Sequence, residues 1–293
     1  MTAPDMPIEE IVRIHDDDPA AAAHALRAMC ASAMADKDLP QFSWLVNHVI
    51  GEKLGAWSEA LQLQRLLPPT GPVVLRLQHA AAALLAGQAV QAWALQARIA
   101  QESGAPAEDA RAAVALRVMQ YIAESADPHD FAMALLDCAR SLPAGAGGRK
   151  LGMAIASSLN NSVSALVERK EIPVDDAAVK SALVEGAQIS RAVWGEAGTW
   201  VNHERADYLI ALCGNRTGEW SVALQAARNG IATIEANGSE DVDRAFLLLE
   251  VARASHGLGD EATRESARAE AVRMSQAFDA SLHGWFNDCL RRA

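Results

Sequence analysis

The segment Gly218-Glu219-Trp220-Ser221-Val222-Ala223-Leu224 is the clearest copy of a motif that occurs twice earlier in the chain. The other copies read Gly55-Ala56-Trp57-Ser58-Glu59-Ala60-Leu61 and Gly87-Gln88-Ala89-Val90-Gln91-Ala92-Trp93. In each copy a glycine interrupts a helical pattern, and an alanine follows inside the next helix. Glycine adopts the left-handed conformation at a helix C-terminus without a Cβ clash, and a small alanine allows close helix packing. The motif predicts a helical hairpin with positive φ at each of the three glycines.

The same helical spacing of apolar residues continues along the whole chain, interrupted by proline and glycine breaks. The breaks delimit about six helical hairpins and an extra N-terminal helix near residues 19–36. The hairpins are predicted at residues 41–71, 73–104, 106–142, 149–197, 200–237 and 241–275. We therefore expect an all-α protein.

Composition limits the classes of protein to which the chain can belong. Hydrophobic residues make up 51% of the 293 residues, which argues against disorder of the whole chain, while aromatics make up only 5%. The formal net charge of −11 makes nucleic acid an unfavourable partner. No apolar run reaches the roughly 20 residues that span a bilayer, so we expect no membrane association. The start, Met1 to Asp5, does not read as a secretory signal, and we expect a cytoplasmic protein.

The glycine–alanine hairpins resemble the centre of a tetratricopeptide repeat (TPR). Aligning Gly55 with the turn glycine of that family places Trp44 and Pro72 where the family favours tryptophan and proline. Residues 159–166, Leu-Asn-Asn-Ser-Val-Ser-Ala-Leu, resemble a helix of the kinesin-light-chain type of repeat. The resemblance implies an α-solenoid of about six antiparallel hairpins in a right-handed superhelix. The expected organisation is an N-terminal helical segment at residues 1–40, the repeats at 41–275 and the end of a capping helix at 276–293.

The family register also predicts a ligand-binding groove. In TPR proteins the first helix of each hairpin lines a concave face, so the resemblance implies a protein–protein interaction module, or scaffold, that binds a peptide or protein surface there. Arginine and asparagine donors on such a face could grip peptide carbonyls or a carboxylate. The register selects Arg117, Tyr121, Asn160, Asn161, Arg205, Tyr208 and Arg253.

No catalytic or metal-binding motif is found in the sequence. Nucleophile elbows, zinc-protease helices, P-loops and dinucleotide fingerprints are absent, so we expect no catalytic residues, no cofactor and no metal. The four cysteines are scattered, which favours buried thiols in a reducing compartment over disulfides. Asp18 before Pro19 is best explained as a helix N-cap.

Two alternatives to peptide binding remain open. His203 and Asp207 share one helix face and could belong to an enzyme site between hairpins. The chain could instead sense a ligand and regulate a separate effector protein.

The C-terminal region raises a separate question about assembly. From Glu261 to Arg292 there is no proline, which predicts one long helix with an apolar stripe that contains Trp285. The stripe either folds back on the preceding hairpins or forms a homodimer through the C-terminal helix, with Trp285 as its anchor.

Overall fold

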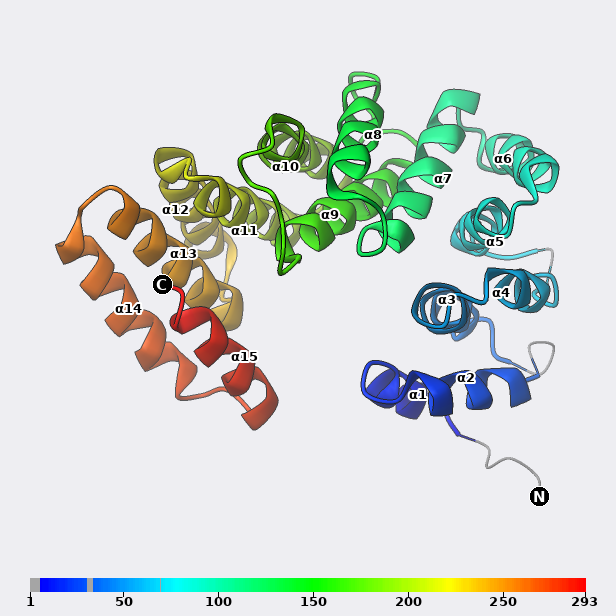
Figure 1. The fold of residues 1–293 in the computed structure, drawn as a ribbon, viewed down its shortest axis with the longest axis horizontal. Coiled ribbons are helices and arrows are strands. Elements are labelled where there is room, and N and C mark those ends of the chain that lie inside the picture. The colour runs from blue at the N-terminus through cyan, green and yellow to red at the C-terminus, as the bar shows by residue number, and fades with distance from the viewer. Residues whose placement is uncertain (1–5, 31–33, 69) are drawn as a thin grey trace. The chain divides into compact units, whose positions relative to one another are not determined.

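The protein is all-α in a computed structural model that describes residues 6–30, 34–68 and 70–293 (Figure 1). Helices make up the regular structure of these ranges, which contain no strand. The chain divides into two compact units, residues 1–125 and 126–293. None of the helices in the described ranges is long and apolar enough to cross a bilayer. Residues 1–5, on which the prediction about a secretory signal depends, lie outside the described residues.

The first unit contains seven α-helices and one π-helix within its described residues. Their bounds are α1 (Ile8–Ile14), α2 (Pro19–Ala28), α3 (Leu39–Leu45), η2 (Val46–Lys53), α4 (Trp57–Gln64), α5 (Val73–Leu85), α6 (Ala89–Ser103) and α7 (Ala107–Ile122). The sequence pattern did not reveal α1, and the helix predicted near residues 19–36 ends at Ala28, with residues 31–33 outside the described chain. Asp18 caps α2 as predicted, because its side chain accepts a hydrogen bond from the Ala21 amide.

The second unit is built from eight α-helices. Their bounds are α8 (Pro128–Arg140), α9 (Gly152–Glu168), α10 (Ala177–Ala197), α11 (Trp200–Thr217), α12 (Trp220–Asn237), α13 (Asp241–Gly257), α14 (Glu261–Ser275) and α15 (Ala280–Leu290). Sequence neighbours pack together: α9 contacts α10, α11 contacts α12, and α13 contacts α14. These pairs coincide with the last three predicted hairpins.

The predicted glycine turns are present in both units. Gly55, Gly87 and Gly218 have φ values of 67°, 74° and 78°, in the left-handed region that favours glycine. The alanine of each motif lies inside the following helix and is fully buried at Ala60, Ala92 and Ala223. The local prediction of a tight turn followed by close helix packing is therefore confirmed at all three places.

The third predicted hairpin is divided between the two units. Its first helix, α7, belongs to the first unit and packs on α5, α6 and η2. Its second helix, α8, belongs to the second unit and packs on α9 and α10. The boundary follows Ser125, and Asp127 caps α8 by accepting hydrogen bonds from two backbone amides.

The π-helix η2 is held in place by a tryptophan of the next helix. The Leu54 amide donates to the Val49 carbonyl five residues earlier, which is the π-helical pattern. The Trp57 ring lies directly on Gly51, where an added Cβ would come within 2.4 Å of a ring carbon. Glycine at position 51 therefore allows the Trp57 ring to pack on η2. This helix carries His48 and Glu52.

The C-terminal region differs from the single long helix predicted from the sequence. Helix α14 ends at Ser275, and α15 begins after Asp279, whose side chain accepts a hydrogen bond from the Leu282 amide. Helix α15 folds back against α13 and α14 within the second unit (Figure 1). Phe286 is fully buried there, whereas Trp285, the predicted anchor, is 52% exposed.

Candidate functional site

A ladder of buried amides crosses the interior of the first unit. The Ser43 hydroxyl donates to Gln64 Oε1 at 2.8 Å, and Gln64 Nε2 donates to Asn47 Oδ1 at 2.8 Å. Asn47 Nδ2 then donates to the carbonyl and the side-chain oxygen of Gln78, at 2.9 and 3.0 Å. The Tyr121 hydroxyl completes the ladder by donating to Gln78 Oε1 at 2.6 Å. These bonds tie α3, η2, α4, α5 and α7 together, because a buried polar group is stable only with its partners in place.

A polar hollow of about 360 Å³ lies at the Tyr121 end of this ladder. Its walls come from η2 and from the end of α7 and the residues that follow it. It is lined by His48, Glu52, Lys53, Tyr121, Glu124 and Ser125. The hollow thus combines an imidazole, two carboxylates and an ammonium group with an aromatic wall. The phenol of this wall is neutral, because burial raises the pKa of Tyr121 to about 12.

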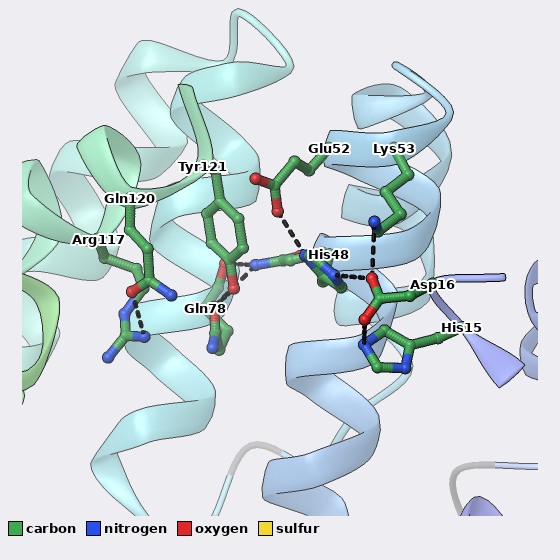
Figure 2. Close-up of polar contacts among 10 residues, drawn as sticks. His15, Asp16, His48, Glu52, Lys53, Gln78, Arg117, Gln120 and Tyr121 are labelled. Atoms are coloured by element: carbon green, nitrogen blue, oxygen red, sulfur yellow. Dashed lines mark hydrogen bonds and ion pairs between the residues drawn. The ribbon is translucent and has the colours of Figure 1, made fainter. Parts of the chain in front are cut away.

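His48 lies between two carboxylates at the edge of the hollow (Figure 2). Its Nδ1 donates to Glu52 Oε2 at 2.5 Å, one turn along η2. Its Nε2 lies 3.7 Å from Asp16 Oδ1, and the same oxygen pairs with Lys53 Nζ at 2.7 Å. The hydrogen bond from Lys53 lowers the pKa of Asp16, so this carboxylate is ionised at neutral pH.

His15 approaches the same carboxylate from the end of α1. Its Nδ1 donates to the Val12 carbonyl at 2.5 Å, and its Nε2 lies 3.4 Å from Asp16 Oδ2. Its ring meets Trp44 edge-on at 5.4 Å between centroids, and Trp44 stacks on His48 at 5.1 Å. His15, Asp16 and His48 offer ligand atoms that all lie within 4.8 Å of one another, so they could hold a metal ion.

Two of the predicted groove residues belong to the first unit. Tyr121 lines the hollow, but its hydroxyl is already bonded to Gln78. Arg117 is buried, and its guanidinium donates to Gln120 Oε1 at 3.0 Å (Figure 2). The structure therefore places Tyr121 where a ligand could touch its ring and gives Arg117 an internal partner.

The other predicted groove residues lie in the second unit. Arg205 and Tyr208 line a small pocket of about 50 Å³ that also contains Trp285 of α15. Arg205 is paired with Asp243 at 2.8 Å, and burial raises the pKa of Tyr208. Arg253 pairs with Glu250 at 3.0 Å and donates to the Arg292 carbonyl beyond α15. Helix α15 thus contributes to the surroundings of these residues.

Asn160 and Asn161 lie on α9 and are not among the residues that line this pocket. Asn160 is half-buried with its Oδ1 3.5 Å from the Ser190 hydroxyl, whereas Asn161 is exposed. Within the second unit, the small pocket thus brings together Arg205 and Tyr208 and does not include these two asparagines.

The alternative site at His203 and Asp207 is occupied by structural contacts. Asp207 accepts a hydrogen bond from Arg191 at 3.0 Å, and burial raises the pKa of its carboxyl group. His203 Nε2 lies 3.0 Å from the Trp194 carbonyl, to which it donates. Both side chains connect α10 to α11, which is a packing role.

The thiols differ in their surroundings. Cys213 and Cys289 are buried, as the sequence predicted, and burial raises the pKa of both. Burial also raises the pKa of the half-buried Cys138 to about 11, which makes it a poor nucleophile. Cys30 is exposed just after α2, so the prediction that every cysteine is buried was wrong there.

A buried carboxyl group beside the small pocket should make the second unit sensitive to pH. Glu204 is fully buried, and burial with Asp243 nearby raises its pKa. The protonated carboxyl group contributes stability that is fully present below the unfolded-state pKa of about 4.3 and is lost as the pH rises through the folded-state pKa of about 9. Glu204→Gln should therefore stabilise the protein more at pH 8 than at pH 5, by over about 1 kcal/mol, the equivalent of one pKa unit. Urea unfolding at the two pH values measures this, and a gain independent of pH would mean that Glu204 is ionised when folded.

The cluster of His15, Asp16 and His48 was not predicted from the sequence. Metal-binding motifs are recognised in a sequence by short, fixed spacing. Here His15 and Asp16 precede α2, whereas His48 lies in η2. The available signal was the pair His48 and Glu52, four apart on one helix, which is the arrangement of a histidine with an orienting carboxylate.

The sequence matches no protein-family model and no curated protein. The function is therefore inferred from the fold and from the residues of the chain itself.

Proposed function

We propose that this chain is a TPR-like helical-repeat protein that binds a segment of another polypeptide. The observation that carries the proposal is the repeated turn: a glycine with positive φ followed by a fully buried alanine, at Gly55, Gly87 and Gly218. Stacked hairpins of this kind bury their apolar faces only against neighbours and leave a long surface for a ligand. The proposed architecture is the right-handed α-solenoid of the TPR family.

The polar hollow of the first unit is the proposed binding surface. Glu52, Lys53 and Ser125 offer acceptors and donors along its rim, and Tyr121 offers an aromatic wall. Groups of both signs suit a peptide backbone, which presents amide donors and carbonyl acceptors in alternation. The ladder behind Tyr121 holds this wall in one position, which reduces the entropy lost on binding. Binding then requires shape, apolar contact and oriented hydrogen bonds, with no bond made or broken.

Site-specific photo-crosslinking in the native cell tests this proposal. A photoreactive amino acid replaces Ser125, which is exposed at the rim of the hollow. Irradiation should yield discrete adducts with one or a few polypeptides, identified by mass spectrometry. The matched control carries the same group at Gln62, which is exposed on α4 outside the lining of the hollow.

The proposal requires a difference between the two positions. Adducts at Ser125 and not at Gln62 would support it, and their loss on Glu52→Ala together with Lys53→Ala would place the ligand at the rim. Equal adducts at both positions, or none at Ser125, would contradict binding at this hollow.

A further inference from the structure

We propose that His15, Asp16 and His48 form a binding site for a divalent transition-metal ion, with Zn²⁺ as the ion that fits best. Two imidazole nitrogens and one carboxylate are ligands that Zn²⁺ accepts, whereas Mg²⁺ and Ca²⁺ prefer oxygen alone. The proposal does not depend on polypeptide binding, because it is tested with the metal ion alone.

The distances among the donor atoms suit a small ion. The two Nε2 atoms lie 3.4 and 3.7 Å from oxygens of Asp16, and the ligand atoms of all three residues are within 4.8 Å of one another. In a tetrahedral site with bonds of 2.0–2.1 Å, neighbouring ligands are separated by about 3.3 Å. The two measured separations are close to this value, and the rings need only a small closure to complete the set.

The remaining nitrogen of each imidazole is already held by an acceptor. His15 Nδ1 donates to the Val12 carbonyl and His48 Nδ1 donates to the Glu52 carboxylate, both at 2.5 Å. Neither acceptor can donate, so in the neutral imidazoles each proton is on Nδ1 and each Nε2 carries a lone pair. Metal-binding histidines are oriented in this way, by a carbonyl or a carboxylate on the other nitrogen. Both lone pairs face Asp16 (Figure 2).

The gap between the imidazoles and Asp16 is too wide for good hydrogen bonds. An N–H···O bond normally has a heavy-atom distance of 2.7–3.2 Å, and here the separations are 3.4 and 3.7 Å. A cation placed between the imidazoles and the carboxylate would be bound by both. Lys53 supplies a charge on one side of Asp16, at 2.7 Å from Oδ1, and leaves Oδ2 facing His15. A metal ion would satisfy all three groups at once.

The surroundings support the ligand geometry and leave access to the ion. Trp44 packs against both rings, edge-on to His15 and stacked on His48, which restricts their rotation. His48 and Lys53 also line the polar hollow, so the site borders a space of about 360 Å³. Three protein ligands leave a fourth position for water or a donor from a bound molecule.

Calorimetric titration of the chelator-treated full chain with Zn²⁺, in competition with a chelator of known affinity, tests the site. The wild-type protein should bind one Zn²⁺ ion, and this binding should depend on His15, Asp16 and His48. His48→Gln and Asp16→Asn should each weaken binding by more than about 100-fold, beyond the 10–100-fold expected for the outer-shell change Glu52→Gln. Asp16 is largely exposed, so its replacement keeps the fold even if His48→Gln does not. Co²⁺ should give an absorption band of four- or five-coordinate cobalt that is lost in Asp16→Asn.

Two control variants separate this site from adventitious binding. His24→Gln removes an exposed histidine of α2 in the same unit, and Cys30→Ser removes the exposed thiol. Both should bind Zn²⁺ as wild type does. The proposal is overturned if Asp16→Asn and His24→Gln weaken binding equally, if Cys30→Ser alone abolishes it, or if wild type gives the cobalt spectrum of the free hydrated ion.

Discussion

Replacing Phe286 by alanine is expected to lower the free energy of unfolding by about 3–5 kcal/mol. Its side chain is fully buried and meets Phe246 and Phe278 edge-on, at 5.7 and 5.6 Å between ring centroids. Removing the ring loses its transfer free energy and leaves a cavity between α13, α14 and α15 that the neighbours only partly fill. Urea unfolding followed by circular dichroism measures the change.

The neighbouring Trp285 provides the matched control. Its ring centroid lies 4.4 Å from that of Phe246, but the side chain is 52% exposed. Trp285→Ala should therefore lower the free energy of unfolding clearly less than Phe286→Ala does. Equal losses would mean that α15 is seated differently on the second unit. Light scattering of both variants also tests a homodimer through α15. Such a dimer requires the exposed Trp285 ring, so Trp285→Ala should be a monomer.

Replacing Asn47 by alanine is expected to lower the free energy of unfolding by about 2–4 kcal/mol, mainly through hydrogen bonds left unmade. Asn47 is fully buried, donates to Gln78 and accepts from Gln64. Alanine leaves one Gln64 amide proton without its partner and a small cavity between η2 and α5. Chemical unfolding of the full chain gives the change.

A milder variant of the same ladder calibrates the effect. Tyr121→Phe removes only the hydroxyl that donates to Gln78, so it should cost about 0.5–1.5 kcal/mol. Gln62→Ala, on the exposed face of α4, should stay within about 0.5 kcal/mol of wild type. An Asn47→Ala protein as stable as Gln62→Ala would show that the ladder does not support the first unit.

Local features of the fold could be predicted from the sequence because short-range physics fixes them. Gly55, Gly87 and Gly218 end helices for a backbone reason that needs no tertiary contact. The cap at Asp18 is equally local. The break between α14 and α15 was missed because it contains neither proline nor glycine, and only the Asp279 cap marks it.

Features that depend on which surfaces meet could not be predicted in this way. Trp93 lies in the repeated glycine–alanine motif and is 61% exposed, whereas Trp194 lies beside the glycine-containing loop that ends α10 and is 8% exposed. Both follow the same helical spacing, and only the position of neighbouring helices distinguishes them. The cluster at His48 is of the same kind, because α1 has to be placed beside η2 before His15 and Asp16 become its neighbours.

The stacking of Trp44 on His48, with 10° between the ring planes, gives the protein an optical probe of its own. Indole fluorescence responds to a change of charge on a ring in contact with it, such as the binding of a metal ion by the imidazole. The emission of Trp44 should therefore change as the metal-ion concentration rises and His48 becomes a ligand. The chain contains seven tryptophans, so the difference between wild type and Trp44→Phe isolates this signal from the others. A spectroscopist could observe the histidine without attaching a label.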